Sequence, residues 1–320
     1  MINPYRLFIH CKNWLYDHNY LKHIKYDTVK VISVGNLNTG GSGKTPFIIF
    51  LVDFILKHRP QAKICVVTKS YKAQLNNSQK VDLSSAQSIQ IFGDEACLLQ
   101  SRLLAVDVWS GPSKSISVQT ALATNTKYDY VIVDDGFSHR KLKRDLEITL
   151  IDTSRAPDHY RLLPVGRMRE DWSSLKRSDL ILLTKTHQMP AQNKIFFLNK
   201  VQGFNKPILF SSNKISLDIE PCPVILITGL GNPEAVKSDL FEKGYTVMKE
   251  FTYPDHYSFP ELEQIKILNW VCEHADWMPV VTEKDYIKIN NPDLKKRLHV
   301  IQLDVLMNDS DLKYLYEKVL

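Results

Sequence analysis

Short apolar runs alternate with amphipathic stretches along most of the chain. Runs of aliphatic and β-branched residues predict buried strands at 29–34, 63–68, 130–133, 146–151 and 180–183. Stretches 46–57 and 94–105 have a helical pattern, and the polar, serine-rich stretch 76–88 is predicted to be a loop. Strands that alternate with helices predict a mostly parallel sheet with helices on both faces.

The last third of the chain has a similar pattern but shows no sequence repeat. Strands are predicted at 224–228, 245–251, 280–281 and 300–303, and helices at 233–243, 260–272 and 310–319. We therefore expect an α/β fold with an N-terminal region at 1–26, a larger domain at 27–206 and a second, smaller α/β domain at 207–320.

The first 26 residues are rich in aromatic and basic side chains. Asn3 and Pro4 suit a helix N-cap and its first turn. One helical face collects Leu7, Cys11, Trp14 and Leu15, and basic residues lie around or after it at positions 6, 12, 22 and 25. The segment is predicted to be a short amphipathic helix, which either lies in a membrane surface or packs on the first domain.

Composition narrows the class of protein. With 44% hydrophobic and 24% charged residues in 320, the chain is expected to be globular. Its net charge of +6 suits an anionic partner such as a nucleotide or an acidic membrane surface. Five widely spaced cysteines without a CxxC pair argue against a disulfide framework or a zinc site. The absence of a long apolar run or signal peptide predicts a cytoplasmic location.

A glycine-rich segment follows the first predicted strand and precedes a predicted helix. Its sequence, GNLNTGGSGKT at 35–45, is typical of a P-loop, whose backbone amides and helix N-terminus bind phosphates. Lys44 is expected to reach the β and γ phosphates, and Thr45 to bind Mg²⁺. Asn38 replaces the usual first glycine, and Asn also tolerates a left-handed backbone. The predicted nucleotide-binding residues are Asn38, Thr39, Gly40, Gly41, Ser42, Gly43, Lys44 and Thr45.

Other polar motifs suggest the remaining chemistry. An apolar strand that ends in Asp134 and Asp135 has the layout of a Walker B element, in which one carboxylate holds the metal. The segment Gly93-Asp94-Glu95, expected after a strand and at a helix start, is either a helix cap or the source of a general base and a metal ligand. His256, next to Asp255, is either structural or an acid–base group.

Together these motifs resemble those of the tetraacyldisaccharide 4'-kinase family. The matching segments lie in the family's order over almost the whole chain: SVGNLNTGGSGKTP (33–46), GDE (93–95), VIVDDGFSHRKLKRDLEITLID (131–152), LLPVGRMRE (162–170), SDLILLTKT (178–186), GLGNPE (229–234), YPDHYSF (253–259) and VVTEKDYIKI (280–289). The P-loop is generic, whereas the DDGF-x-HR stretch, the following RDLEI and the ordered set are specific.

The resemblance implies a P-loop NTPase-like domain, a second α/β domain and a cleft between them. It implies transfer of phosphate from ATP to the 4'-hydroxyl of an acylated disaccharide lipid at the cytoplasmic face of the inner membrane, with no nucleic acid and no obligate protein partner. It further implies that Thr45, Glu95 and Asp135 bind Mg²⁺, and that Asp94 is the base, assisted by His256.

The sequence departs from the family's pattern in three segments, and these departures concern details of substrate contact rather than the phosphate chemistry. The usual Ser-Arg-Gly-Tyr stretch is Lys-Ser-Tyr-Lys at 69–72, the glutamine before His139 is Ser138, and Pro-Ala-Gly-Pro-Leu-Arg is Pro-Val-Gly-Arg-Met-Arg at 164–169. Two other classes stay open. A GTPase switch or metallochaperone-like protein would carry Asn/Thr-Lys-x-Asp, which neither TKTH (184–187) nor TEKD (282–285) matches fully. An ATP-dependent ligase would give a carboxyl-activated product instead.

Overall fold

The computed structural model describes residues 4–69, 75–85 and 87–320, and the departure at 70–72 falls outside them. Its larger sheet consists of β1 (Lys30–Asn36), β2 (Ile64–Lys69), β3 (Gln79–Lys80), β4 (Asp107–Gly111), β5 (Tyr130–Asp134), β6 (Leu146–Asp152), β7 (Leu180–Thr184) and β8 (Ile208–Phe210). The order across the sheet is β3-β4-β2-β5-β1-β6-β7-β8. Every neighbouring pair is parallel except β3 with β4. The expected mostly parallel sheet is confirmed.

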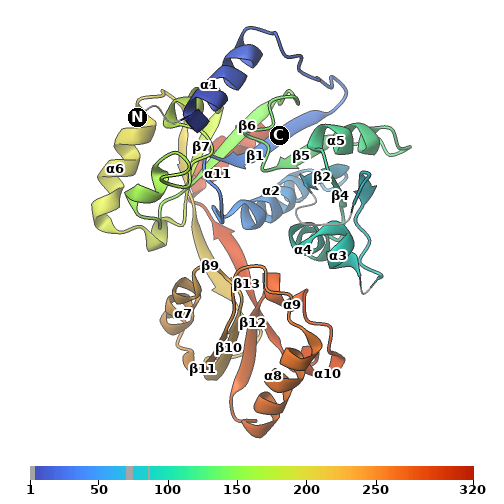
Figure 1. Cartoon of the computed structure of the whole chain (residues 1–320), viewed down its shortest axis with the longest axis vertical. Helices are drawn as coiled ribbons and strands as arrows, with labels where there is room; N and C mark the ends of the chain where they lie inside the picture. The colour runs from blue at the N-terminus through green and yellow to red at the C-terminus, as the bar shows by residue number, and fades with distance from the viewer. Residues whose placement is uncertain (1–3, 70–74, 86) are drawn as a thin grey trace.

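Helices cover both faces of this sheet (Figure 1). They are α2 (Lys44–His58), α3 (Ser88–Phe92), α4 (Asp94–Arg102), α5 (Lys114–Leu122) and α6 (Ala191–Gln202), with short 3-10 turns η1 (Pro157–Tyr160), η2 (Trp172–Arg177) and η3 (Thr186–Gln188). Aliphatic residues of β1, β2 and β5 pack against α2 and α4 on one face, and α5 and α6 pack on the other. Burial of these apolar side chains is the main force that holds the layers together.

The smaller sheet consists of β9 (Ser212–Ser216), β10 (Pro223–Thr228), β11 (Thr246–Thr252), β12 (Met278–Thr282) and β13 (His299–Leu306). Its order is β11-β10-β12-β13-β9, and only β9 is antiparallel to its neighbour. Its helices are α7 (Pro233–Glu242), α8 (Glu261–Glu273), α9 (Glu283–Tyr286) and α10 (Pro292–Lys295). The predicted second, smaller α/β unit is therefore present as a sheet of its own.

The chain returns to the larger sheet at its end. The last helix, α11 (Asp309–Val319), buries Leu315 and Val319 in the same core as β1 and α2. Lys30 donates hydrogen bonds of 2.9 Å to the carbonyl oxygens of residues 318 and 319. Strand β8 likewise extends the larger sheet, so the two sheets do not divide at residue 206. The domain boundaries stay a prediction.

Some elements were not predicted, for local reasons. Strand β4 has only Val108 and Trp109 as apolar residues, and α5 (KSISVQTAL) is rich in serine and β-branched residues of low helix propensity. Helix α6 and strand β9 were also missed. The expectation that Asp94 follows a strand is wrong, because α3 precedes it and ends at Phe92, and Gly93, whose φ is 89°, separates the two helices.

The N-terminal helix α1 (Pro4–Asp17) lies against the larger unit through polar contacts. Arg140 donates to the Asn13 carbonyl oxygen at 2.9 Å and to Asp17 at 2.6 Å, and the Tyr5 hydroxyl donates to the carbonyl oxygen of Arg169. None of its residues is buried. Leu7 and Phe8 are each 64% exposed and Trp14 50%. Within the described residues, no helix has the length and apolar character needed to cross a bilayer.

Candidate active site

The glycine-rich loop lies at the carboxyl end of β1 and opens α2. Gly40 and Gly43 have φ values of 109° and 83°, which only glycine adopts without strain. The amides of Thr39 and Ser42 donate within the protein, to the carbonyl oxygens of Arg167 and Gly40. These two amides are therefore used within the protein, and the expectation that the loop and the N-terminus of α2 bind phosphate stays a prediction.

The loop is held by the last residue of β1 and by two residues at the end of β7. Asn36 donates to the Ser42 hydroxyl at 2.8 Å. At the end of β7, the Thr184 hydroxyl donates to the carbonyl oxygen of Ser42 at 3.0 Å, and Lys185 donates to that of Gly41 at 3.0 Å. The TKTH segment thus supports the backbone of the loop, which is a role that sequence reasoning did not assign to it.

Asp134, the last residue of β5, is buried beside the loop. One carboxylate oxygen accepts a hydrogen bond of 2.8 Å from Thr68, and the other has no hydrogen-bond partner. Burial raises the pKa of this carboxyl above its ordinary value, although Lys44 and Lys114 act to lower it. A buried, unpartnered carboxylate oxygen is rare in folded proteins and suggests that a ligand binds there.

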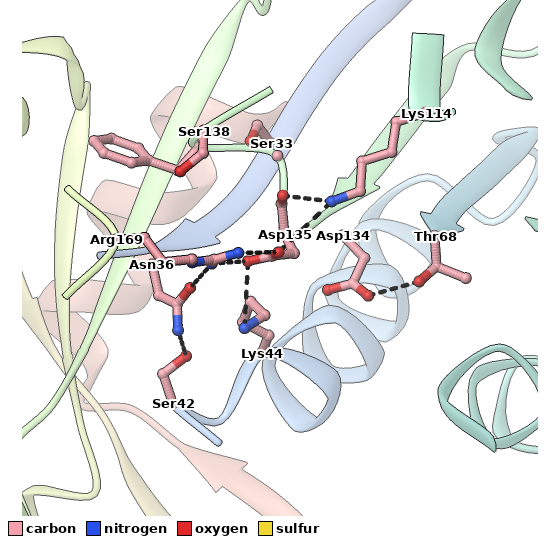
Figure 2. Close-up of polar contacts among 12 residues, drawn as sticks. Ser33, Asn36, Ser42, Lys44, Thr68, Lys114, Asp134, Asp135, Ser138 and Arg169 are labelled. Carbon is pink, nitrogen blue, oxygen red and sulfur yellow. Dashed lines mark hydrogen bonds and ion pairs between the residues drawn. The ribbon is translucent and has the colours of Figure 1, made fainter. Parts of the chain in front are cut away.

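Asp135, by contrast, is surrounded by cations (Figure 2). Arg169 donates to both of its oxygens at 2.8 and 2.5 Å, and Lys44 lies 3.5 Å from one of them. Burial would raise the pKa of Asp135, but Lys44 and Arg169 together hold it well below its ordinary value. Its φ of 51° is left-handed, so the turn after β5 is strained and depends on these contacts.

Glu95, at the start of α4, completes a group of carboxylates around Lys44. Burial raises the pKa of Glu95, and the negative charge of Asp134 raises it further. Two carboxyl groups that repel each other, one with an unpartnered oxygen, fit a divalent cation. No cluster of three or more His, Cys, Asp and Glu side chains suited to a metal occurs in 4–69, 75–85 and 87–320. Mg²⁺ usually needs only one or two carboxylates, with phosphate and water as further ligands.

Asp94 and His256 meet across the two units. His256 follows β11 of the smaller sheet, and its Nδ1 forms a hydrogen bond of 2.7 Å with the Oδ2 of Asp94 at the start of α4. The Asp94 side chain is 13% exposed and that of His256 28%, so the pair remains accessible to a substrate. The structure thus brings together two residues that are 162 positions apart in the chain.

Sequence reasoning missed one buried cation and assigned no role to a second. Lys114, almost fully buried at the start of α5, donates to the carbonyl oxygen of Asp135 at 2.5 Å and lies 3.8 Å from its carboxylate. It follows a Gly-Pro turn after β4, the strand that the pattern did not reveal. Arg169 belongs to the LLPVGRMRE motif, whose contact with Asp135 could not be read from the sequence.

The RDLEI stretch at 144–148 also has a structural role. Arg144 donates to the carbonyl oxygens of Gly136 and Phe137, directly after Asp135, and its Nε lies 3.0 Å from Glu147. Glu147 in turn accepts from the Ser33 hydroxyl of β1 at 2.8 Å. This buried ion pair fixes the turn that carries Asp134 and Asp135, after the strand that pairs with β1.

The sequence is similar to those of known proteins. Residues 3–320 match the sequence model of the family described as tetraacyldisaccharide-1-P 4'-kinase. The tetraacyldisaccharide 4'-kinase of Bdellovibrio bacteriovorus is 31% identical over 294 residues, which cover 87% of this chain and 84% of that one. The enzyme of the same name from Aquifex aeolicus is 32% identical over 265 residues, 80% of this chain and 81% of that one.

A solved structure shows the same architecture. LpxK from Aquifex aeolicus, an "apo" form in complex with ATP, superposes with a TM-score of 0.78 at 28% identity and covers 98% of this chain and 96% of that one. The agreement therefore includes both sheets as well as the motifs. From the full-length match and the shared fold, this chain belongs to the tetraacyldisaccharide 4'-kinase family.

Proposed function

We propose that this chain transfers the γ-phosphoryl group of ATP to the 4'-hydroxyl of a tetraacyldisaccharide 1-phosphate in lipid A biosynthesis. Membership of the family supports the reaction, and the ATP complex of the related structure supports the phosphate donor. The observation that carries the proposal is the hydrogen bond between Asp94 and His256, which sets an acid–base pair beside a P-loop. A kinase that acts on an alcohol needs both parts.

On the phosphate side, residues 38–45 are proposed to hold the triphosphate. Lys44 would leave Asp135, 3.5 Å away, and bind the β and γ phosphates. The exchange keeps the lysine charge compensated throughout, because one anion replaces another. Phosphoryl transfer depends mainly on such positioning and neutralisation rather than on covalent catalysis.

We assign Mg²⁺ to Thr45, Glu95 and Asp135, with Asp134 as the alternative carboxylate. The unpartnered oxygen of Asp134 supports the alternative. The hydrogen bonds from Arg169 fix the carboxylate of Asp135 in position. When bound, Mg²⁺ neutralises charge on the transferring phosphoryl group. Of the four residues, Thr45 lies in the first turn of α2, Asp134 and Asp135 lie at the end of β5, and Glu95 lies at the start of α4.

On the acceptor side, Asp94 is proposed to take the proton of the sugar hydroxyl as the oxygen attacks phosphorus. The Oδ2 of Asp94 is hydrogen-bonded to His256, so the histidine orients the carboxylate and can share the proton. Because His256 comes from the smaller unit, the acid–base pair exists only while the two units are in contact. We infer that this requirement limits hydrolysis of ATP by water.

No observation favours the GTPase or the ligase alternative. Thr184 and Lys185 contact the P-loop backbone, but His187 occupies the position at which a guanine-binding motif has aspartate. The TEKD segment lies in the smaller unit, at the end of β12. The test is incubation of the pure chain with labelled ATP and acylated disaccharide 1-phosphate, followed by chromatography. Label in the lipid at the 4' position is expected; labelled free phosphate alone would contradict the proposal.

We also propose that the chain acts at the cytoplasmic face of the inner membrane, since its acceptor carries several acyl chains. The exposed Leu7, Phe8 and Trp14 of α1 support a peripheral contact. Flotation with anionic liposomes, at low and high salt, tests this. We expect salt-sensitive binding that a Leu7→Ser, Phe8→Ser, Trp14→Ser variant loses with ATP binding unchanged. Equal binding by both proteins would place the contact elsewhere.

A further inference from the structure

The motif VVTEKDYIKI at 280–289 has no part in the proposed chemistry, yet each polar side chain of its TEKD segment has a defined contact. The segment forms the end of β12 and α9, which faces α4 of the larger unit (Figure 1). Asp285 is fully buried and accepts from the Gly229 amide at 2.8 Å, the Thr282 hydroxyl at 2.7 Å and Lys288 at 3.0 Å. These hydrogen bonds fix α9 rigidly to the smaller sheet.

Lys284 holds the loop that carries His256. Its ammonium donates to Asp255 at 2.8 Å, and the same carboxylate oxygen accepts from the backbone amide of His256 at 3.1 Å. His256 has a φ of 65°, a left-handed conformation that costs a non-glycine residue free energy and needs outside support. The Lys284–Asp255 ion pair, with the lysine side chain 21% exposed, supplies this support.

Glu283, the preceding residue, holds the helix that begins at Asp94. It forms an ion pair with Arg102, the last residue of α4, whereas Asp94 is the first residue of that helix. The side chain of Glu283 is 12% exposed and that of Arg102 is 21% exposed, so the pair is largely shielded from water. The helix α4 is therefore tied to the smaller unit at both ends, through Asp94 to His256 and through Arg102 to Glu283.

We propose that Glu283 and Lys284 are positioning residues that hold the two members of the Asp94–His256 pair together. One residue of α9 fixes the carboxylate's helix and the next fixes the histidine's loop, so a single rigid turn sets the distance between them. Neither residue needs to touch ATP or the acceptor. The inference deepens the proposed function and rests on it, because positioning matters only if the pair works in phosphoryl transfer.

The expected effects follow from the geometry. A displacement of a catalytic group by about 1 Å can cost about 100-fold in rate. Lys284→Met should therefore lower kcat by about tenfold to about 100-fold, because the unpaired Asp255 no longer holds the strained loop. Glu283→Gln keeps the shape but loses the charge pair, and its loss of kcat should be smaller, about threefold to about tenfold. The KM for ATP should stay within about twofold for both, since the P-loop is untouched.

The decisive measurement is kcat for Lys284→Met in two backgrounds, the otherwise native chain and His256→Ala. If Lys284 acts through the histidine, the substitution should lower kcat in the first and change it less than about twofold in the second. Lys284→Arg should restore most of the rate. A merely structural lysine would give the same loss in both backgrounds, and that result, or no loss at all, would overturn the inference.

Two further variants keep the test sound. Lys237→Met is the matched control, since Lys237 is a 25%-exposed lysine of the same unit that pairs with Glu234 and Glu250 away from the loop; it should keep full kcat. Should Lys284→Met fail to fold, Asp255→Asn tests the same contact at a side chain that is 47% exposed. It should show the same dependence on the histidine, and an equal loss in both backgrounds would overturn the inference.

A failure of the proposed function would be recognised separately. If the native chain transfers no phosphate to the acylated disaccharide, the reaction is wrong, but the contact can still be measured by NMR of labelled histidine. The inference then predicts that Lys284→Met changes the imidazole chemical shifts of His256, whereas Lys237→Met leaves them unchanged. Identical His256 signals in the native and Lys284→Met proteins would overturn it.

Discussion

The two sides of the site are built differently. The P-loop is one continuous stretch at the end of a strand whose residues are almost entirely buried, and much of its chemistry comes from its own backbone. The histidine side is an open loop, in which side chains from both units and from three separate segments meet. A local backbone site is robust to small shifts, whereas an assembled side-chain site depends on how two units are held together.

The difference predicts different failures. Substitutions in the P-loop should weaken the binding of ATP whether or not the acceptor is present. Changes at the histidine side should leave ATP binding intact and slow only the transfer. The following predictions test this contrast.

The largest effect is expected at Asp94. Asp94→Ala removes the proposed base and should slow the chemical step by about 10² to 10⁴-fold. Binding of ATP should be unchanged, which isothermal titration can measure alongside single-turnover transfer. A variant that transfers phosphate at the native rate would exclude Asp94 as the base and leave the carboxylate as a helix-start group only.

Lys44→Ala should lower turnover by about 10²-fold or more, because it removes a preorganised cation from the transferring phosphate. In contrast to Asp94→Ala, this change should also weaken ATP binding. The melting temperature should be retained, and Lys57→Ala, at an exposed position of the same helix, is the control. Full activity of Lys44→Ala would refute the P-loop assignment.

A moderate effect is expected for the two aspartates after β5. Asp135→Asn should raise the Mg²⁺ concentration for half-maximal rate about tenfold, since a charged oxygen ligand becomes neutral. Asp134→Asn provides the comparison, because its unpartnered oxygen makes it the alternative ligand. The variant with the larger rise identifies the ligand. Native Mg²⁺ dependence in both would remove the Walker B assignment.

The smallest effect concerns stability and pH. Burial raises the pKa of Glu147 to about 7, against the lowering influence of Arg144. The folded state therefore binds this proton more tightly than the unfolded state, so its contribution to stability is present below the ordinary glutamate pKa and is lost as pH rises to about 7. Urea unfolding should show less decline between pH 5 and 7.5 for Glu147→Gln than for the native chain. An equal decline would contradict this.

The contrast also explains what could be predicted from the sequence. The parallel sheets and most strands follow from apolar runs, because burial on both faces imposes a continuous apolar pattern. The P-loop residues could be proposed one by one, since the segment is contiguous, and their binding of nucleotide stays a prediction. Strand β4 and helix α5 could not, because a five-residue strand with two large apolar side chains carries too little pattern.

The histidine side could be predicted only through the family resemblance. Neither the PDH segment at 254–256 nor the GDE segment at 93–95 indicates that His256 contacts Asp94, because the contact depends on how the two units pack. Lys114 and the contacts of Glu283 and Lys284 are of the same kind. Long-range side-chain contacts are set by tertiary structure, so a single sequence does not reveal them.

We propose that Asp94 and His256 act as one catalytic unit, assembled from the larger and the smaller unit of the fold. The measurement that tests it most directly is the single-turnover rate of transfer for Asp94→Ala, His256→Ala and the double variant, with saturating ATP. If the two residues act as one unit, the double variant should be little slower than the slower single variant, because either change disables the same unit. Losses that multiply would show that the two residues work separately and would contradict the proposed joint role of Asp94 and His256.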